Sequence, residues 1–257
     1  FTSLTPGISL ANIFGNSILR PYATFSHPNS LGGYFLVVGL TLFIEKRFAI
    51  LWVFVSVVLV VLSFSQAVWF TLVFVILLLV FSKNKKHFKP LVQTVFLGSV
   101  LFSLVLPVAS KLMVQNYQFS ETVQKRLELN VVSQKLVTKN IVTGVGLGNF
   151  IPASVSTYKT DGGGLIKNVS WFLQPVHNIY LLVLSETGIV GLLIFFFTVR
   201  RVIANANTKF VILLVPILLT GLVDHYWLTL QQNFLLFSVV VGIVLSSDTI
   251  TSWKKKS

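Results

Sequence analysis

His177 is the residue of this chain with the clearest chemical potential, because it stands beside Asn178 where a long polar segment meets an apolar one. Pro175 just before them predicts a helix that begins here, since Pro fixes the chain ahead of a helix and either His177 or Asn178 can serve near its N-cap. A helix N-terminus favours bound anions such as phosphate. An imidazole can accept a proton near neutral pH. The pattern predicts acid–base chemistry beside an anion; the alternative is an interfacial cap.

Charged and small residues follow in the same apolar run. Gly188 and Gly191, three residues apart, predict close packing of another helix. Glu186 lies about two turns inside the run, where a lone charge costs about 2.5–3.5 kcal/mol. We expect its carboxyl group to face protein or a wet cavity, either in a working role or in a pair. Asp224 and His225 lie in a short gap further along, and a direct role is expected less strongly for them.

The composition shows what must hold these residues in place. Of the 257 residues, 54% are hydrophobic and only 11% are charged, whereas soluble domains carry about a quarter charged residues. The composition excludes a water-soluble globule and predicts an all-α, polytopic transmembrane helix bundle. The net charge of +13 is interpreted as a topology signal rather than as nucleic-acid binding. Cysteine is absent and the four histidines are scattered, so no metal and no cofactor is predicted.

Seven apolar runs come close to the length that a bilayer requires. They are Asn29–Ile44, Phe48–Phe64, Ala67–Ser82, Pro90–Val108, Asn178–Val199, Lys209–Val223 and Asn233–Ser247. Lys and Arg gather in the gaps after the first, third and fifth runs and after the seventh, which the positive-inside rule places in the cytoplasm. The first residues, the tip at Gln66 and the long stretch 109–177 then face outward.

The long outward stretch is predicted to form a small domain of its own. Val123, Leu127, Val131 and Leu136 have roughly helical spacing, which predicts one amphipathic helix over 121–139 on the outer membrane face. The run 161–164, Asp followed by three Gly, predicts a flexible turn. The Gly-rich stretch at 144–149 does not fit a dinucleotide site, because it is one residue short and lacks the βαβ context.

Three segments together resemble the O-antigen ligases and polymerases, a family of membrane glycosyltransferases. His177-Asn178 followed by Gly188 and Gly191 is similar to the family's histidine-asparagine signature. Thr24-Phe25-Ser26-His27-Pro28-Asn29 resembles the opening of a family core helix, and Arg126 followed by 143–150 resembles the outer-loop arginine and the glycine-rich stretch. The three glycines of that stretch are Gly144, Gly146 and Gly148.

The resemblance implies transfer of a glycan from an undecaprenyl-diphosphate carrier to an acceptor on the outer face, without metal or nucleotide. It implies that His177 activates the acceptor or steadies the reacting centre and that Arg126 holds the diphosphate. For Arg126 the alternative is a solvated helix face. Family members commonly carry an arginine where this chain has Gln66, which weakens the predicted donor site; Arg20 or Lys111 could compensate. The remaining residues predicted to bind substrate are His27, Asn29 and Asn178.

The predicted organisation is an extracytoplasmic segment 1–28, four transmembrane helices in 29–108, an extracytoplasmic loop 109–177, three transmembrane helices in 178–247 and a cytoplasmic basic tail 248–257. A chain that starts at Phe1 is expected to be the C-terminal part of a longer protein. The predicted function is glycosyl transfer in surface polysaccharide or lipopolysaccharide assembly at the bacterial inner membrane. Two alternatives stay open: a transporter or flippase of a lipid-linked glycan, and a relative that binds carrier lipid without turnover.

Overall fold

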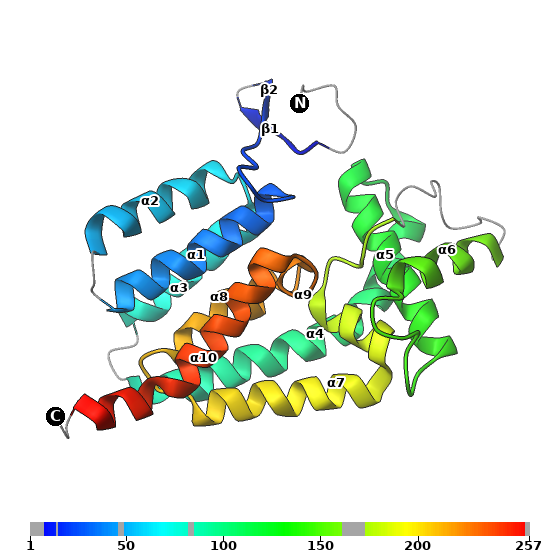
Figure 1. The fold of residues 1–257 in the computed structure, drawn as a ribbon. Coiled ribbons are helices and arrows are strands. Elements are labelled where there is room, and N and C mark those ends of the chain that lie inside the picture. Colours follow the sequence, from blue (N-terminus) through cyan, green and yellow to red (C-terminus); the bar gives the residue numbers. More distant parts are fainter. Residues whose placement is uncertain (1–7, 14, 46–48, 82–84, 161–172, 255–257) are drawn as a thin grey trace. The chain divides into compact units, whose positions relative to one another are not determined.

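The computed structural model of the chain is mostly helical (Figure 1). It describes residues 8–13, 15–45, 49–81, 85–160 and 173–254. The helices are α1 (Pro28–Glu45), α2 (Ala49–Leu62), α3 (Gln66–Phe81), η1 (Lys85–His87), α4 (Phe88–Asn116), α5 (Glu121–Lys139), α6 (Phe150–Thr160), α7 (Ile179–Asn205), η3 (Val211–Leu213), α8 (Leu214–Thr220), α9 (Tyr226–Thr229) and α10 (Gln231–Lys254). A short antiparallel hairpin, β1 (Leu10–Ile13) with β2 (Asn16–Leu19), precedes them and was not predicted.

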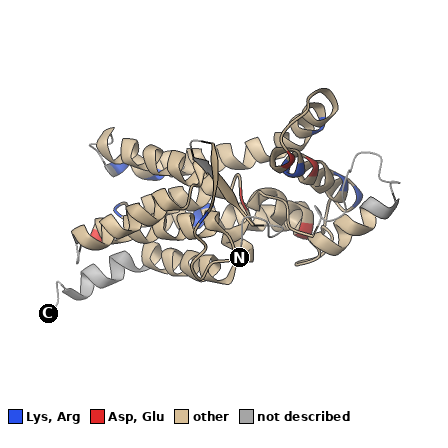
Figure 2. Ribbon diagram, turned by 90° about the horizontal axis from the view of Figure 1, so that it is seen from above, with Lys and Arg blue, Asp and Glu red and all other residues tan. Residues whose placement is uncertain are grey.

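Each predicted apolar run falls on helix, but the bounds differ. Within the described residues, α4 and α7 are long and apolar enough to cross a membrane, and other apolar helices are shorter. Figure 2 shows how few charged positions interrupt these helices. Helix α4 continues past the predicted end at 108 to Asn116 although it contains Pro107. Two polar residues beyond Pro107 are hydrogen-bonded: Ser110 accepts a hydrogen bond from Asn130, and Asn116 donates to Leu112. The number of spans and their sidedness stay predictions.

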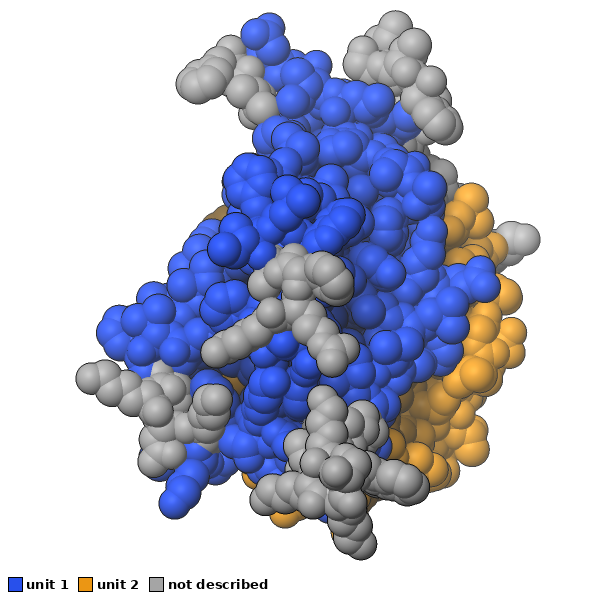
Figure 3. Space-filling model, turned by 60° about the vertical axis from the view of Figure 1, so that its left-hand side comes forward, with its two compact units in different colours: residues 1–92, 202–220, 226–257 blue, residues 93–201, 221–225 orange. Residues whose placement is uncertain are grey.

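The chain divides into two compact units (Figure 3). Unit 1 comprises residues 1–92, 202–220 and 226–257, and unit 2 comprises 93–201 and 221–225. In unit 1, the last part of the chain returns to pack with the first. The predicted boundaries, which follow membrane topology, stay a prediction. Unit 2 also includes the five residues 221–225, together with the long stretch 109–177.

Unit 1 is built around α1. Leu36 of α1, Val60 of α2 and Val68 of α3 form a buried apolar cluster. Small residues on α1 let its neighbours come close: a Cβ on Gly39 would lie 2.7 Å from Cβ of Ser56, and one on Gly33 would overlap the phenol of Tyr226. Asn233 of α10 donates a side-chain hydrogen bond to the carbonyl of Ser30 of α1 at 3.0 Å.

Arg20 ties the N-terminal segment of unit 1 to the tip between α2 and α3. Its Nε and Nη2 donate to the carbonyl of Ser63 at 2.9 and 2.6 Å, and Nη2 also donates to Oδ1 of Asn29 at 2.7 Å. Ser63 is fully buried just after the last residue of α2, where carbonyls lack helical partners and a cation is favoured. Gln66 starts α3 at the same tip and is exposed. A guanidinium therefore does lie at this tip, but it comes from Arg20.

Arg20→Ala should lower the free energy of unfolding by about 1–3 kcal/mol, because the buried Ser63 carbonyl loses two hydrogen bonds from a charged donor. Thermal unfolding of the purified full chain in detergent micelles measures the effect. Lys111→Ala is the matched control, since Lys111 is exposed on α4. An Arg20→Ala protein that unfolds together with the wild type would show that the clamp contributes nothing.

Unit 2 contains the helix predicted at 121–139, and α5 has these bounds. Its buried face was predicted wrongly in part: Val123 is 42% exposed, while Gln124 and Glu128 are buried. Polar side chains can face inward here because they pair: Gln124 donates to Glu128 at 2.8 Å, and Ser133 shares a hydrogen bond with Ser185 of α7 at 2.7 Å. The buried apolar cluster beside them is Leu129, Val132, Leu136, Phe150, Val176, Leu181 and Leu182.

Candidate functional site

The turn 221–225 organises the polar residues of unit 2. Its first carbonyl, that of Gly221, accepts a hydrogen bond from the amide of Ile179 at 2.8 Å. That amide is the first of α7 and has no partner within the helix. The side chains of Asn178, Arg126 and His177 contact the next three residues of the turn, Leu222, Val223 and Asp224. The start of α7 and the turn are therefore fixed to one another.

Asn178 is the N-cap of α7, whereas the sequence left His177 and Asn178 both open for this position. Its Oδ1 accepts the amides of Tyr180 and Leu181 at 2.9 and 3.0 Å, which are the donors that an N-cap satisfies. Its Nδ2 donates to Oγ of Ser103 and to the carbonyl of Leu222. The side chain is fully buried and its amide is used inside the protein. A substrate contact by Asn178 stays a prediction.

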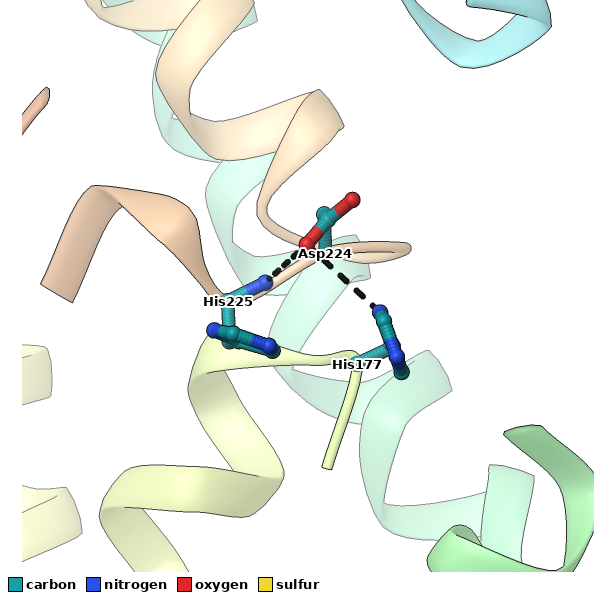
Figure 4. A group of neighbouring side chains, drawn as sticks. All are labelled: His177, Asp224 and His225. Atoms are coloured by element: carbon teal, nitrogen blue, oxygen red, sulfur yellow. Dashed lines mark hydrogen bonds and ion pairs between the residues drawn. The ribbon is translucent and has the colours of Figure 1, made fainter. Parts of the chain in front are cut away.

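His177, Asp224 and His225 come together at the start of α7 (Figure 4). Nδ1 of His177 lies 3.5 Å from Oδ1 of Asp224, and the two side chains are 16% and 9% exposed. The same Oδ1 accepts the backbone amide of His225 at 2.9 Å, and the two imidazole centroids are 5.1 Å apart. One ligand atom from each residue lies within 4.8 Å of the others. The prediction that the histidines are scattered is therefore wrong for this pair.

Arg126 of α5 reaches the residue before Asp224. Its Nη1 donates to the carbonyl of Val223 at 3.4 Å, and the side chain is partly exposed. Arg126 and His177 thus contact consecutive residues of one turn. Burial lowers the pKa of the neighbouring Lys125 below its ordinary value, and the carboxylate of Glu121 opposes this. A lysine ammonium loses its charge more readily on burial than an arginine guanidinium does. Arginine is therefore better suited than lysine to supply a fixed positive charge at this position.

The glycine-rich stretch and Gly188 form one interlocked structure in unit 2. Gly188 has φ 65° and ψ −167°, which interrupts α7. The interruption exposes backbone groups on both sides, and the segment 141–146 satisfies them: Val145 and Gly146 donate to the carbonyls of Ser185 and Glu186, while Ile189 donates to the carbonyl of Ile141. Gly188 was predicted to allow close packing of another helix. The structure gives a different reason for glycine at this position, which is its backbone conformation.

The other glycines and Glu186 support the same structure. Gly144, Gly146 and Gly148 all have positive φ, which favours glycine. A Cβ on Gly191 would overlap the side chain of Thr187 one turn earlier on its own helix. Oε1 of Glu186 accepts the amide of Phe150, the first residue of α6, at 3.2 Å, and a carboxylate is favoured there. Glu186 is therefore paired.

A sequence model of the O-antigen ligase family matches residues 35–196, which is more than half of the chain. This chain belongs to the O-antigen ligase family. Comparison with curated proteins gave no match, and comparison with solved structures gave none either. Membership makes the chain a membrane protein with a glycosyltransferase-like role in polysaccharide biosynthesis, acting on lipid-linked glycan and acceptor substrates in general.

The O-antigen ligase match includes Gln66, Arg126, His177 and Gly188 and ends before Asp224. Asp224 was expected less strongly to have a direct role, and the structure places its carboxyl group beside His177. The available signal was its position as an acidic residue next to His225 in a gap that contains no Lys or Arg.

The predicted substrate residues of unit 1 are held by their own segment. His27 accepts the amide of Asn29 at Nδ1, and its Nε2 shares a hydrogen bond with Ser9 at 3.0 Å. Asn29 in turn accepts from Arg20. These contacts stabilise the entry to α1, and a substrate role for His27, Asn29, Gln66 or Arg20 stays a prediction. The predicted glycine turn at 161–164 lies outside the described residues.

Proposed function

We propose that this chain transfers a glycan from an undecaprenyl-diphosphate carrier to an acceptor hydroxyl on the extracytoplasmic face of the bacterial inner membrane. The observation that supports it best is that Arg126 and His177 contact consecutive residues of the turn 221–225. A glycosyl transfer of this kind needs both groups: a base for the acceptor hydroxyl and a cation for the departing diphosphate.

His177 and Arg126 have different roles in this reaction. Nδ1 of His177 faces Asp224, so we assign Nε2 to the acceptor hydroxyl, whose proton it takes while the acceptor oxygen bonds to the anomeric carbon. The bond from that carbon to the diphosphate oxygen breaks, and the carrier diphosphate leaves with the electron pair. Arg126 offers paired N–H donors that match phosphate oxygens.

Asp224 has a positioning role in this proposal. A carboxylate that accepts from Nδ1–H fixes the tautomer that leaves Nε2 free to act as base. The separation of 3.5 Å is longer than a hydrogen bond, and such contacts often tighten only when substrate is bound. The 9% exposure of the carboxylate keeps water from competing for His177.

Asp224→Asn should reduce kcat about 10- to 100-fold with little change in KM for the acceptor, because the amide can orient the imidazole wrongly but touches no substrate. The measurement is steady-state transfer by the purified protein in detergent micelles. Asp224→Glu should recover part of the loss, since it restores a carboxylate. A kcat that Asp224→Asn leaves at the wild-type value would remove Asp224 from the mechanism.

The decisive experiment for the function uses the full chain in proteoliposomes with an undecaprenyl-diphosphate-linked glycan and a glycan acceptor. We expect release of undecaprenyl diphosphate and formation of a new glycosidic product. Movement of the intact donor across the bilayer without release would indicate a flippase. Binding of the donor without release or movement would indicate a relative that holds carrier lipid without turnover.

A further inference from the structure

The His177–Asp224–His225 cluster has a donor set that suits a transition-metal ion. It offers two imidazole nitrogens and one carboxylate oxygen, and these atoms all lie within 4.8 Å of one another. Nδ1 of His177 is buried and has no hydrogen-bond partner among the described residues. Asp224 and His225 come from one turn and His177 from the start of α7, so two separate segments converge on this point (Figure 4).

The spacing fits the geometry of zinc. Zn²⁺ binds imidazole nitrogen and carboxylate oxygen at about 2.0–2.2 Å with tetrahedral angles, which places neighbouring ligand atoms about 3.3–3.5 Å apart. The 3.5 Å between Nδ1 of His177 and Oδ1 of Asp224 is such a separation. The third ligand atom, from His225, must move closer by roughly 1 Å to complete the set. Its partial exposure leaves room for that rotation.

We propose that these three side chains bind Zn²⁺, and that bound Zn²⁺ inhibits glycosyl transfer. The binding itself depends only on the cluster; the inhibition rests on the proposed function. Zn²⁺ on Nδ1 of His177 leaves the ring proton on Nε2, which then has no lone pair to accept the proton of the acceptor hydroxyl. The ion also occupies the carboxylate of Asp224, which the reaction needs to orient the imidazole. Three protein ligands leave a fourth position for water or for a substrate oxygen.

The donor set also determines which metal ion the cluster prefers. Mg²⁺ and Ca²⁺ prefer shells of oxygen ligands, which one carboxylate and two imidazoles do not supply. Imidazole suits Zn²⁺, Ni²⁺ and Cu²⁺, and among these the compact three-ligand arrangement fits the tetrahedral ion best. Bound Zn²⁺ is an inhibitor because it occupies side chains that the transfer needs. It takes no part in the transfer itself.

The test uses the untagged full chain, treated with a chelator and kept in detergent micelles. Isothermal titration with ZnCl₂ should give one binding event per chain, and MgCl₂ under the same conditions should give none. His225→Ala should weaken Zn²⁺ binding at least tenfold, and Asp224→Asn should do so independently. His87→Ala is the control, because His87 is exposed in η1 and should leave the titration unchanged. Absence of binding, or binding that neither cluster variant weakens, would overturn the site.

Inhibition is measured separately, as the ratio of transfer rates with and without Zn²⁺ for each protein. We expect a loss of at least tenfold for the wild type at a saturating concentration and a ratio near one for His225→Ala at that concentration. Zn²⁺ that binds the wild type without slowing transfer would overturn the inhibitory half. A wild type that binds Zn²⁺ but shows no transfer at all would instead overturn the proposed function and leave the binding site standing.

Discussion

His177→Ala should lower kcat for glycosyl transfer by about 10²- to 10⁴-fold, the range that a positioned general base contributes. Alanine removes the only group at the start of α7 to which we assign the acceptor proton, and neither Asp224 nor Arg126 can replace it: the carboxylate faces Nδ1 and the guanidinium has no lone pair to accept a proton. The measurement is single-turnover release of undecaprenyl diphosphate in proteoliposomes, because it isolates the chemical step from substrate exchange.

His87→Ala provides the matched control for this measurement. It removes an imidazole of the same chain from an exposed position in η1. We expect transfer by that variant to equal the wild-type rate. His177→Ala should also keep the wild-type unfolding temperature, since the N-cap bonds of Asn178 do not involve the imidazole. A correctly folded His177→Ala protein with undiminished turnover would falsify the role of His177 as base.

The parts of this site that the sequence predicts are those set by local rules. Asn178 is an N-cap whose carboxamide pairs with the next two helical amides, and the residues that identify it lie within four positions of one another. Helix α5 could be predicted because its apolar residues recur at helical spacing over several turns. Membrane character follows from composition alone, because so few charges cannot cover a soluble surface.

The parts that escape prediction depend on contacts between distant segments. Asp224 pairs with His177, which precedes it by more than forty residues in the chain, and no spacing rule joins them. The buried face of α5 includes Ser133, which shares a hydrogen bond with Ser185 of α7, a contact that hydrophobic periodicity cannot register. Gly188 lay in a pattern typical of helix packing, while its conformation is fixed by a loop more than forty residues earlier in the chain. In each case a tertiary hydrogen bond or close contact outweighs a local preference.

Gly188 is where a single methyl group should have the largest structural effect. Its φ of 65° and ψ of −167° lie in a region that is essentially restricted to glycine. A Cβ there would also overlap the carbonyl of Val142 and come within 2.6 Å of the amide nitrogen of Thr143. These atoms belong to backbone that caps the interrupted helix, so they cannot move away without breaking the hydrogen bonds from Ile189 and Val190. Strain and steric overlap therefore act on the same few residues.

Gly188→Ala should destabilise the protein by about 3 kcal/mol or more and sharply reduce the amount of folded protein recovered from membranes. Fluorescence-detected size exclusion and thermal unfolding in detergent measure both effects. Gly98→Ala is the control on α4, where no atom lies within 4 Å of the added Cβ, and it should be neutral or stabilise by about 0.5–1 kcal/mol because alanine favours helix. If both variants behaved alike, the interruption of α7 could not depend on glycine. Because His177 lies just before α7 and the interruption lies further along that helix, a Gly188→Ala protein that does fold should also lose transfer activity, whereas Gly98→Ala should retain it.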